Sequence, residues 1–257
     1  MPHAALDGWY VILLRPALTR GALLRAVNKQ GGRPVCVPGL RLQAATDPHA
    51  ADQALARALR AALVLVTSPA AVHFARRLPS WQGAASARFA AVGSGTAQAL
   101  HGAGIRDVIV PSTRQDSDGL LQHPALETGK LSGVGLLTAP GGRGRLVDVL
   151  NQRGVEVLRA DVYRRLPPRL DRRHLNALQA IDGPSALLHS SAEALANVRA
   201  ALPPAEWAIL RNAVTIASSE RLSAQARELG FRIGVQAASA NSRDLLDALR
   251  RSIDEAC

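Results

Sequence analysis

Short apolar runs alternate along the chain with segments in which apolar residues recur every three or four positions. The runs are too short for helices, and several lack the alternation of half-exposed strands, so they indicate strands covered on both faces. They lie at 10–15, 62–67, 88–93, 107–111, 134–139, 185–190, 213–218 and 232–237. The segments between them favour helices, at 20–30, 51–60, 143–153, 222–230 and 242–252 among others. The alternation predicts an α/β fold of doubly wound parallel sheets.

The chain contains this pattern twice. The following pairs of residues all have the same offset of 123 positions: Arg20 and Arg143, Asn28 and Asn151, Gly31 and Gly154, Thr67 and Ser190, and Ser68 and Ser191. Four glycines stand where predicted helices should end, which favours left-handed caps at Gly31, Gly104, Gly154 and Gly230. The sequence therefore predicts an internal duplication with two α/β domains.

Two segments rich in proline and charge interrupt the repeat, at 31–43 and at 157–170. We expect the chain to cross between the domains at these places. Because the two crossings also lie about one repeat apart, the residues leave two arrangements open. The halves are contiguous, or one domain is made of both chain ends around a central domain.

Polar and glycine-rich turns follow the predicted strands. In a doubly wound domain, ligands bind beyond the carboxyl ends of the strands, where helix N-termini present unpaired N–H groups. Helix capping accounts for part of each turn, since Ser68 precedes Pro69 and Ser190 with Glu193 fits a capping box. It does not account for the repetition. We expect a cleft for a ligand with several carboxylates or phosphates, lined by Arg15, Thr67, Ser68, Gly93, Ser94, Thr96, Gly142, Arg143, Ser190, Ser191 and Ser218.

Cofactor and metal motifs are absent from the sequence. No Walker pattern or GxGxxG fingerprint is present, the seven histidines have no ligand spacing, and Cys36 and Cys257 are far apart. We therefore expect no cofactor, metal or disulfide. No apolar run approaches the roughly 20 residues of a membrane helix, and the N-terminal segment lacks the features of a signal peptide, so we expect a cytoplasmic protein.

Two side chains raise the question of catalysis. His189 lies on a predicted buried strand and is expected to be a hydrogen-bonded core residue. Tyr163 lies in the second crossing beside Arg164 and Arg165, where its hydroxyl could serve as a proton donor. An ordinary boundary aromatic explains Tyr163 equally well.

The net charge of +11 is carried almost wholly by arginine, since only Lys29 and Lys130 of the 31 basic residues are lysine. Arginine pairs well with carboxylate and phosphate, which indicates an anionic partner. Nucleic acid, an acidic metabolite and mere compositional bias all remain open on charge alone. A nucleic-acid binder is disfavoured by the 3% aromatic content and by the lack of a groove-reading motif.

Taken in order, several segments resemble the uroporphyrinogen-III synthase family over nearly the whole chain. They are Arg15-Pro16 after the first strand, TSPAAV at 67–72, AVGSGTAQAL at 91–100, VPSTRQDSDGLL at 110–121, TAPGGRGRLVDVL at 138–150, VYRR at 162–165 and SSERLSAQARELGF at 218–231. The chain departs from the family pattern at Pro140, where many members have an acidic residue, and at ASSERL (217–222), which replaces a glycine-threonine turn.

This resemblance implies a discontinuous domain of residues 1–38 and 167–257 around a second domain of residues 39–166, joined by two strands. It implies a cofactor-independent lyase that cyclises hydroxymethylbilane to uroporphyrinogen III, with inversion of ring D and loss of water. Tyr163 would be the general acid or hydrogen-bond donor, and the strand-end residues would bind the substrate. A monomer that receives its substrate in a transient handover from hydroxymethylbilane synthase is also implied, with no nucleic acid or membrane partner. The alternative is a non-catalytic two-domain binding protein for an acidic small metabolite.

Overall fold

The computed structural model describes residues 5–112, 116–127, 129, 131–141 and 144–255. The chain divides into two compact units: unit 1 is Met1–Arg41 with Leu166–Cys257, and unit 2 is Leu42–Arg165. The family resemblance implied divisions at 38/39 and 166/167. Both passages between the units lie in a two-stranded sheet of β3 (Arg41–Ala44) and β9 (Tyr163–Leu166).

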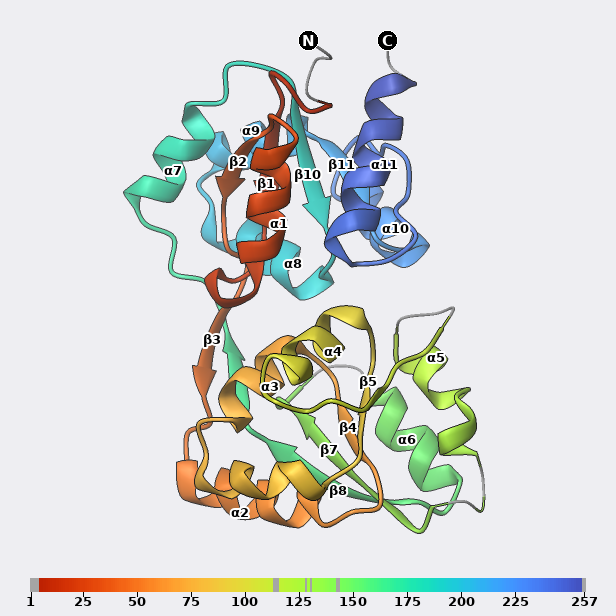
Figure 1. Ribbon diagram of the computed structural model, residues 1–257. Helices are drawn as coiled ribbons and strands as arrows, with labels where there is room; N and C mark the ends of the chain where they lie inside the picture. Colours follow the sequence, from red (N-terminus) through yellow and green to blue (C-terminus); the bar gives the residue numbers. More distant parts are fainter. Residues whose placement is uncertain (1–4, 113–115, 128, 130, 142–143, 256–257) are drawn as a thin grey trace. The chain divides into compact units, whose positions relative to one another are not determined.

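Unit 1 is built on a four-stranded sheet in the order β11-β10-β1-β2 (Figure 1). All three pairings are parallel, so the expectation of a parallel α/β sheet is confirmed. The strands are β1 (Tyr10–Leu13), β2 (Arg33–Cys36), β10 (Ser185–His189) and β11 (Val214–Ala217). The helices are α1 (Ala17–Lys29), α7 (Arg172–Gln179), α8 (Ala192–Ala201), α9 (Pro204–Asn212), α10 (Glu220–Glu228) and α11 (Ser242–Asp254).

Alternate residues of the unit 1 strands enter two different cores. Val11 and Leu13 pack with α1 and α11 on one face, whereas Ile12 and Leu187 pack with α7, α8, α9 and α10 on the other. Both faces are covered because the strands are apolar at consecutive positions rather than at every second one.

Unit 2 has a five-stranded sheet in the order β6-β5-β4-β7-β8, again parallel throughout. Its strands are β4 (Val64–Val66), β5 (Phe89–Ala91), β6 (Val108–Ile109), β7 (Gly133–Thr138) and β8 (Glu156–Asp161). One face packs against α2 (Pro48–Leu59), α3 (Pro69–Ala75), α4 (Ser94–His101) and the 3₁₀ helix η1 (Pro79–Ser86). The other packs against α5 (Ser117–Leu121), α6 (Arg145–Gln152) and η2 (Pro124–Leu126).

The elements that the sequence did not predict as strands are mostly edge strands. β2 and β8 end their sheets, where Pro34 in β2 and charged residues in β8 are tolerated because one side of each strand pairs with no neighbour. The same residues interrupt the apolar pattern, which is why these segments were interpreted only as crossings.

The prediction of a strand at 232–237 is wrong. This segment makes an isolated bridge, between Ile233 and Thr215, and no strand. Gly234 N and Ala237 N still donate to Thr215 O and Ala217 O of β11, at 3.0 and 2.9 Å, but the amide of Val235 donates to Ser252 Oγ of α11 at 2.6 Å, so no regular ladder forms.

The four glycines expected to end helices all have the predicted left-handed conformation. Their φ angles are 81° at Gly31, 91° at Gly104, 73° at Gly154 and 81° at Gly230. The matching pair Gly31 and Gly154 therefore reflects a shared helix termination in the two units.

Gly135 of β7 gives a direct test of how unit 2 is packed. A Cβ atom at this position would lie 2.2 Å from the carbonyl oxygen of Ala58 in α2. Since that oxygen belongs to a helix backbone, Gly135→Ala should push α2 from the sheet and lower the free energy of unfolding by about 1–3 kcal/mol. The measurement is urea unfolding of the intact protein.

Gly133→Ala is the matched control in the same strand. There the nearest atom to a new Cβ is Glu156 O at 3.5 Å, an ordinary contact. Equal destabilisation by the two substitutions would contradict the close approach of α2.

Candidate functional site

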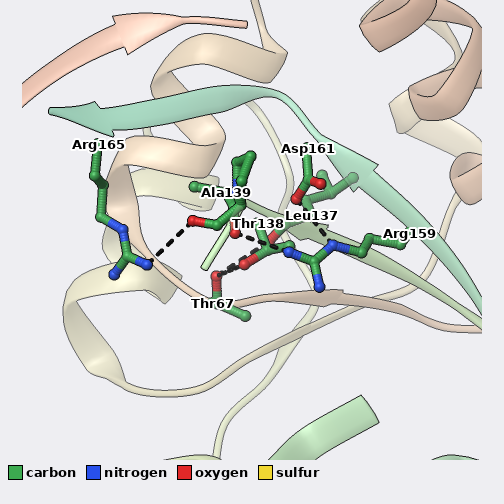
Figure 2. Close-up of polar contacts among 8 residues, drawn as sticks. Thr67, Leu137, Thr138, Ala139, Arg159, Asp161 and Arg165 are labelled. Atoms are coloured by element: carbon green, nitrogen blue, oxygen red, sulfur yellow. Dashed lines mark hydrogen bonds and ion pairs between the residues drawn. The ribbon is translucent and has the colours of Figure 1, made fainter. Parts of the chain in front are cut away.

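The carboxyl ends of β4 and β7 bring two hydroxyls together in unit 2. Val66 pairs with Leu137, so Thr67 and Thr138 follow at equivalent positions of neighbouring strands. Thr67 Oγ1 lies 3.1 Å from Thr138 Oγ1 and 3.3 Å from Leu137 O. Figure 2 marks these contacts with dashed lines. The Thr67 amide also donates to Leu137 O at 3.2 Å. Thr67 therefore continues the sheet by one residue before the chain turns into α3.

Ser68 connects the start of α3 with Tyr163. Its Oγ accepts the Ala71 N–H at 3.1 Å, which makes it the N-cap that the sequence predicted before Pro69. The same oxygen lies 3.1 Å from the Tyr163 hydroxyl. The Tyr163 ring, 6% exposed, also stacks on Phe74 of α3 with the ring centroids 5.6 Å apart and the planes 8° from parallel. Helix α3 thus fixes Tyr163 at both the ring and the hydroxyl.

Two arginines donate to the turn that follows β7. Arg159 Nη2 lies 3.0 Å from Ala139 O, while its Nε lies 2.9 Å from Asp161 Oδ1. Arg165 Nη2 lies 3.2 Å from Pro140 O. In Figure 2 the two guanidinium groups approach the turn from opposite sides. The carbonyl oxygens of the turn are thereby held by two cations from β8 and β9.

The start of α4 lies beside the start of α3. Gly93 is the N-cap of α4, and a Cβ placed on Gly95 would lie 4.0 Å from Pro69 Cγ. Two helix N-termini therefore face the same edge of the unit 2 sheet, where Ser94 is the first residue of α4. Thr96 lies in the first turn of α4 and is buried, with only 3% of its surface exposed. Gly142 and Arg143 lie outside the described residues.

In unit 1, sheet register aligns three candidate residues. Leu13 pairs with Leu188, and His189 pairs with Ala217. Arg15, Ser190 and Ser218 therefore follow their strands at equivalent positions on one edge of the unit 1 sheet.

The capping box proposed for Ser190 and Glu193 is wrong. Ser191 is the N-cap of α8, and its Oγ accepts the Ala194 N–H at 3.2 Å. Strand β10 ends one residue earlier, at His189, so Ser190 occupies the connection between strand and helix. The helix start is one residue later than the S-x-x-E spacing indicated.

Arg15 is directed toward the segment that leads into α11. Its guanidinium donates to Ala240 O and, at 3.3 Å, to Ser242 Oγ. Burial lowers the pKa of Arg15 from its ordinary value. The side chain therefore ties the β1–α1 turn to the N-terminus of α11.

His189 is the buried core residue that the sequence predicted. It is 0% exposed, and its Nε2 lies 3.2 Å from Gln225 Oε1 of α10. Burial lowers the pKa of His189 to about 4, against the opposing effect of the Gln225 hydrogen bond and with a further lowering by the charge of Arg221. The imidazole is neutral at physiological pH.

The structure thus forms one candidate set in each unit. Thr67, Ser68, Gly93, Ser94 and Tyr163 lie at the carboxyl edge of the unit 2 sheet, and Arg15, Ser190, Ser191 and Ser218 lie at that of unit 1. Sequence reasoning did not select Thr138, Phe74, Arg159 or Asp161. The pairing of β4 with β7 reveals Thr138, the stacking on Tyr163 reveals Phe74, and the hydrogen bonds of Arg159 to Ala139 O and Asp161 reveal the other two.

Other regions add no candidate to these sets. A surface pocket of about 440 Å³ lies near the opposite edge of the unit 2 sheet, lined by Leu63, Arg88, Pro124, Ala125 and Leu131. Within the described ranges, no group of three or more His, Cys, Asp or Glu is arranged to hold a metal ion. The helices of the part of the chain that the structure describes include none with the length and apolarity required to cross a membrane.

Comparisons with known proteins agree on one family. The family model "Uroporphyrinogen-III synthase HemD" matches residues 21–247. The uroporphyrinogen-III synthase of Salmonella typhimurium is 30% identical over 246 residues, which cover 93% of this chain and 99% of the relative. That of Escherichia coli is 30% identical over 209 residues, or 79% of this chain and 84% of the relative.

Solved structures share the fold. A mutant uroporphyrinogen III synthase from Thermus thermophilus matches with a TM-score of 0.56 and 22% identity, over 96% of this chain and 99% of that one. The uroporphyrinogen-III synthetase of Helicobacter pylori matches with a TM-score of 0.58 and 15% identity, over 96% and 100% of the two chains. At these identities the likeness establishes the architecture, and two units of parallel sheets agree with it.

The lowered pKa of His189 predicts an acid sensitivity of stability. Because the imidazole binds a proton with a pKa of about 4 when folded and near 6.5 when unfolded, the unfolded state gains protons first as the pH falls. Above about pH 6.5 the imidazole is neutral in both states and does not change the free energy of unfolding. As the pH falls to about 4, this group lowers the free energy of unfolding by as much as about 3 kcal/mol. Urea unfolding across this range measures the effect.

His189→Gln is the comparison, since an amide does not titrate there. The variant should lose less stability than the unaltered protein between about pH 6.5 and 4, while the carboxylates titrate equally in both. Parallel pH profiles would show that His189 is not buried neutral in the folded protein.

Proposed function

The chain belongs to the uroporphyrinogen-III synthase family, and we propose that it cyclises hydroxymethylbilane to uroporphyrinogen III with inversion of ring D and loss of water. The observation that carries this proposal is the family match over residues 21–247, together with a relative of the same name that is 30% identical over 93% of the chain. We assign the reaction to the lyases and propose that it needs no cofactor.

The substrate itself supplies most of the electronic driving force in this reaction. A pyrrole nitrogen pushes out the terminal hydroxyl, which leaves with a proton as water, and an azafulvene forms. The substituted α-carbon of ring D then attacks the exocyclic methylene of the azafulvene, which gives a spiro intermediate. The older bond between this carbon and its methylene breaks and re-forms at the other α-carbon of ring D, and loss of a proton from that carbon leaves the ring inverted. The protein must therefore supply a proton donor for the hydroxyl and hold the linear chain against direct closure.

Tyr163 is the proposed proton or hydrogen-bond donor. Ser68 Oγ already accepts the Ala71 N–H, so the Ser68 hydroxyl can donate its own hydrogen to the Tyr163 oxygen. In that arrangement the Tyr163 O–H is free to donate to the substrate. The parallel contact with Phe74 limits rotation of the ring and so fixes the direction of the hydroxyl.

Each unit is proposed to bind carboxylates of the substrate at its own sheet edge. In unit 2, the N-termini of α3 and α4 provide N–H groups and partial positive charge beside Thr67, Ser68 and Ser94. In unit 1, Ser191 is the N-cap of α8, Ser190 and Ser218 directly precede the N-caps of α8 and α10, and Arg15 follows β1. Many moderate contacts suit a substrate that carries many acetate and propionate groups.

The remaining expectations are proposals of the same kind. We propose a cytoplasmic monomer that takes hydroxymethylbilane in a transient handover from hydroxymethylbilane synthase. The excess of arginine fits such a polyanionic substrate. The alternative, a binding protein for an acidic metabolite, would hold a ligand at the same strand ends without converting it.

The test of the function is an assay with freshly prepared hydroxymethylbilane. Oxidised products are resolved by chromatography, and we expect the type III isomer in excess over the type I isomer that forms without enzyme. Protein treated with a metal chelator should give the same result. Type I product alone, formed at the uncatalysed rate, would refute the enzyme and favour the binding protein.

Tyr163→Phe tests the proton donor. Removing the hydroxyl takes away an interaction made with the departing group, so kcat should fall by roughly 10- to 100-fold while KM changes by less than about 3-fold. Steady-state kinetics under the same product assay measure both.

Tyr10→Phe is the matched control, because Tyr10 is the other of the two tyrosines. Its hydroxyl lies 2.6 Å from Asp182 Oδ1, in unit 1 at the amino-terminal end of β1. This variant should retain its kcat. A folded Tyr163→Phe variant with unaltered kcat would remove Tyr163 from the mechanism.

A further inference from the structure

His189 is a polar residue in a position that otherwise suits an apolar one. The three residues before it, Ala186, Leu187 and Leu188, are buried and apolar, and His189 itself is 0% exposed. Among the described residues its Nδ1 has no hydrogen-bond partner. An unsatisfied polar atom in a core costs free energy, so packing alone does not explain a histidine here.

The orientation of Gln225 determines which imidazole nitrogen carries the proton. Gln225 Nε2 donates to the Ala192 carbonyl oxygen at 3.3 Å, and that oxygen can only accept. The other end of the amide, Oε1, therefore faces His189 Nε2 at 3.2 Å, and this oxygen also can only accept. His189 is consequently the tautomer with its proton on Nε2, and the hydrogen bonds run from His189 to Gln225 to Ala192.

This chain of hydrogen bonds joins the turns that carry the candidate hydroxyls of unit 1. Ala192 is the first residue of α8 and directly follows Ser190 and Ser191. Gln225 lies in α10, which begins just after Ser218 and Ser219. The His189 carbonyl oxygen accepts the Ser218 N–H at 3.0 Å. The end of β10, the start of α8 and the body of α10 are thus linked through one histidine.

We propose that His189 and Gln225 are positioning residues that fix the spacing between the turns at 190–191 and 218–219, and so set how tightly unit 1 holds the substrate carboxylates. This inference rests on the proposed function. The buried imidazole does not reach the substrate; it acts through the backbone of the two turns. Burial lowers the pKa of His189 to about 4, so the imidazole is neutral at working pH and carries its proton on Nε2.

Gln225→Met is the principal test, because methionine has a similar length but cannot join His189 to Ala192. We expect KM for hydroxymethylbilane to rise about 5- to 10-fold with kcat within about 2-fold, since the altered turns weaken ground-state and transition-state binding alike. His189→Phe should do the same. His189→Gln, which keeps an N–H donor near the position of Nε2, should restore KM to within about 2-fold of the unaltered protein.

Thr215→Val is the matched control. Thr215 is 0% exposed on the neighbouring strand β11, and among the described residues its Oγ1 has no partner. Valine keeps the shape and removes only the hydroxyl, so KM and kcat should not change. Thermal unfolding of every variant separates stability from substrate affinity.

The outcomes distinguish this proposal from the function on which it rests. A folded Gln225→Met variant with unchanged KM overturns the positioning role even if His189→Phe does not fold. A KM raised equally by Thr215→Val also overturns it, because general loosening of the core would then be the cause. If the unaltered protein forms no type III isomer, the proposed function fails and this inference fails with it.

Discussion

Parallel pairing between buried strands is the constraint on which the rest of the structure depends. Every ladder in the two main sheets is parallel, so all the strands of a sheet end at the same edge. Strands β4, β5, β10 and β11 each reach the N-cap of the following helix within two residues, and N–H groups are unpaired there, whereas the edge strands β2 and β8 lead into β3 and β9. The hydroxyls at these turns are consequences of that geometry, and register then decides which of them become neighbours, as with Thr67 and Thr138.

Hydrogen bonds at the two sheet edges serve different purposes. In unit 2, Ser68 caps α3 and also contacts Tyr163, so the group that begins a helix also orients the proposed proton donor. In unit 1, Ser191 caps α8, and the hydrogen bonds of His189 and Gln225 link the end of β10 and α10 to the start of α8. The internal duplication has therefore kept the arrangement of strands and helices while the polar contacts around it have diverged.

Polar groups in the core of unit 1 carry a cost that apolar residues would avoid. His189 is neutral and has one unsatisfied nitrogen, and the Thr215 hydroxyl also has no partner among the described residues. Conflicts between local preference and the fold are most often retained at functional sites. The hydrogen bonds of His189 and Gln225 meet this expectation because they contact the turns at 190–191 and 218–219, whereas the buried Thr215 side chain makes no such link.

The sequence by itself determined the α/β class, the parallel sheets, the duplication and the helix ends at Gly31, Gly104, Gly154 and Gly230, because each leaves a local pattern of apolar spacing or special backbone conformation. It also placed the polar strand ends, since a strand and its following helix are adjacent in the chain. Strand order, register and side-chain direction depend on residues far apart, so only the tertiary structure decided that Thr138 lies beside Thr67, that Phe74 stacks on Tyr163 and that Gln225 joins His189 to Ala192. For the same reason the edge strands β2 and β8 were missed, and a strand was wrongly predicted at 232–237, because a strand requires a regular ladder with its neighbour and this segment makes an isolated bridge to β11.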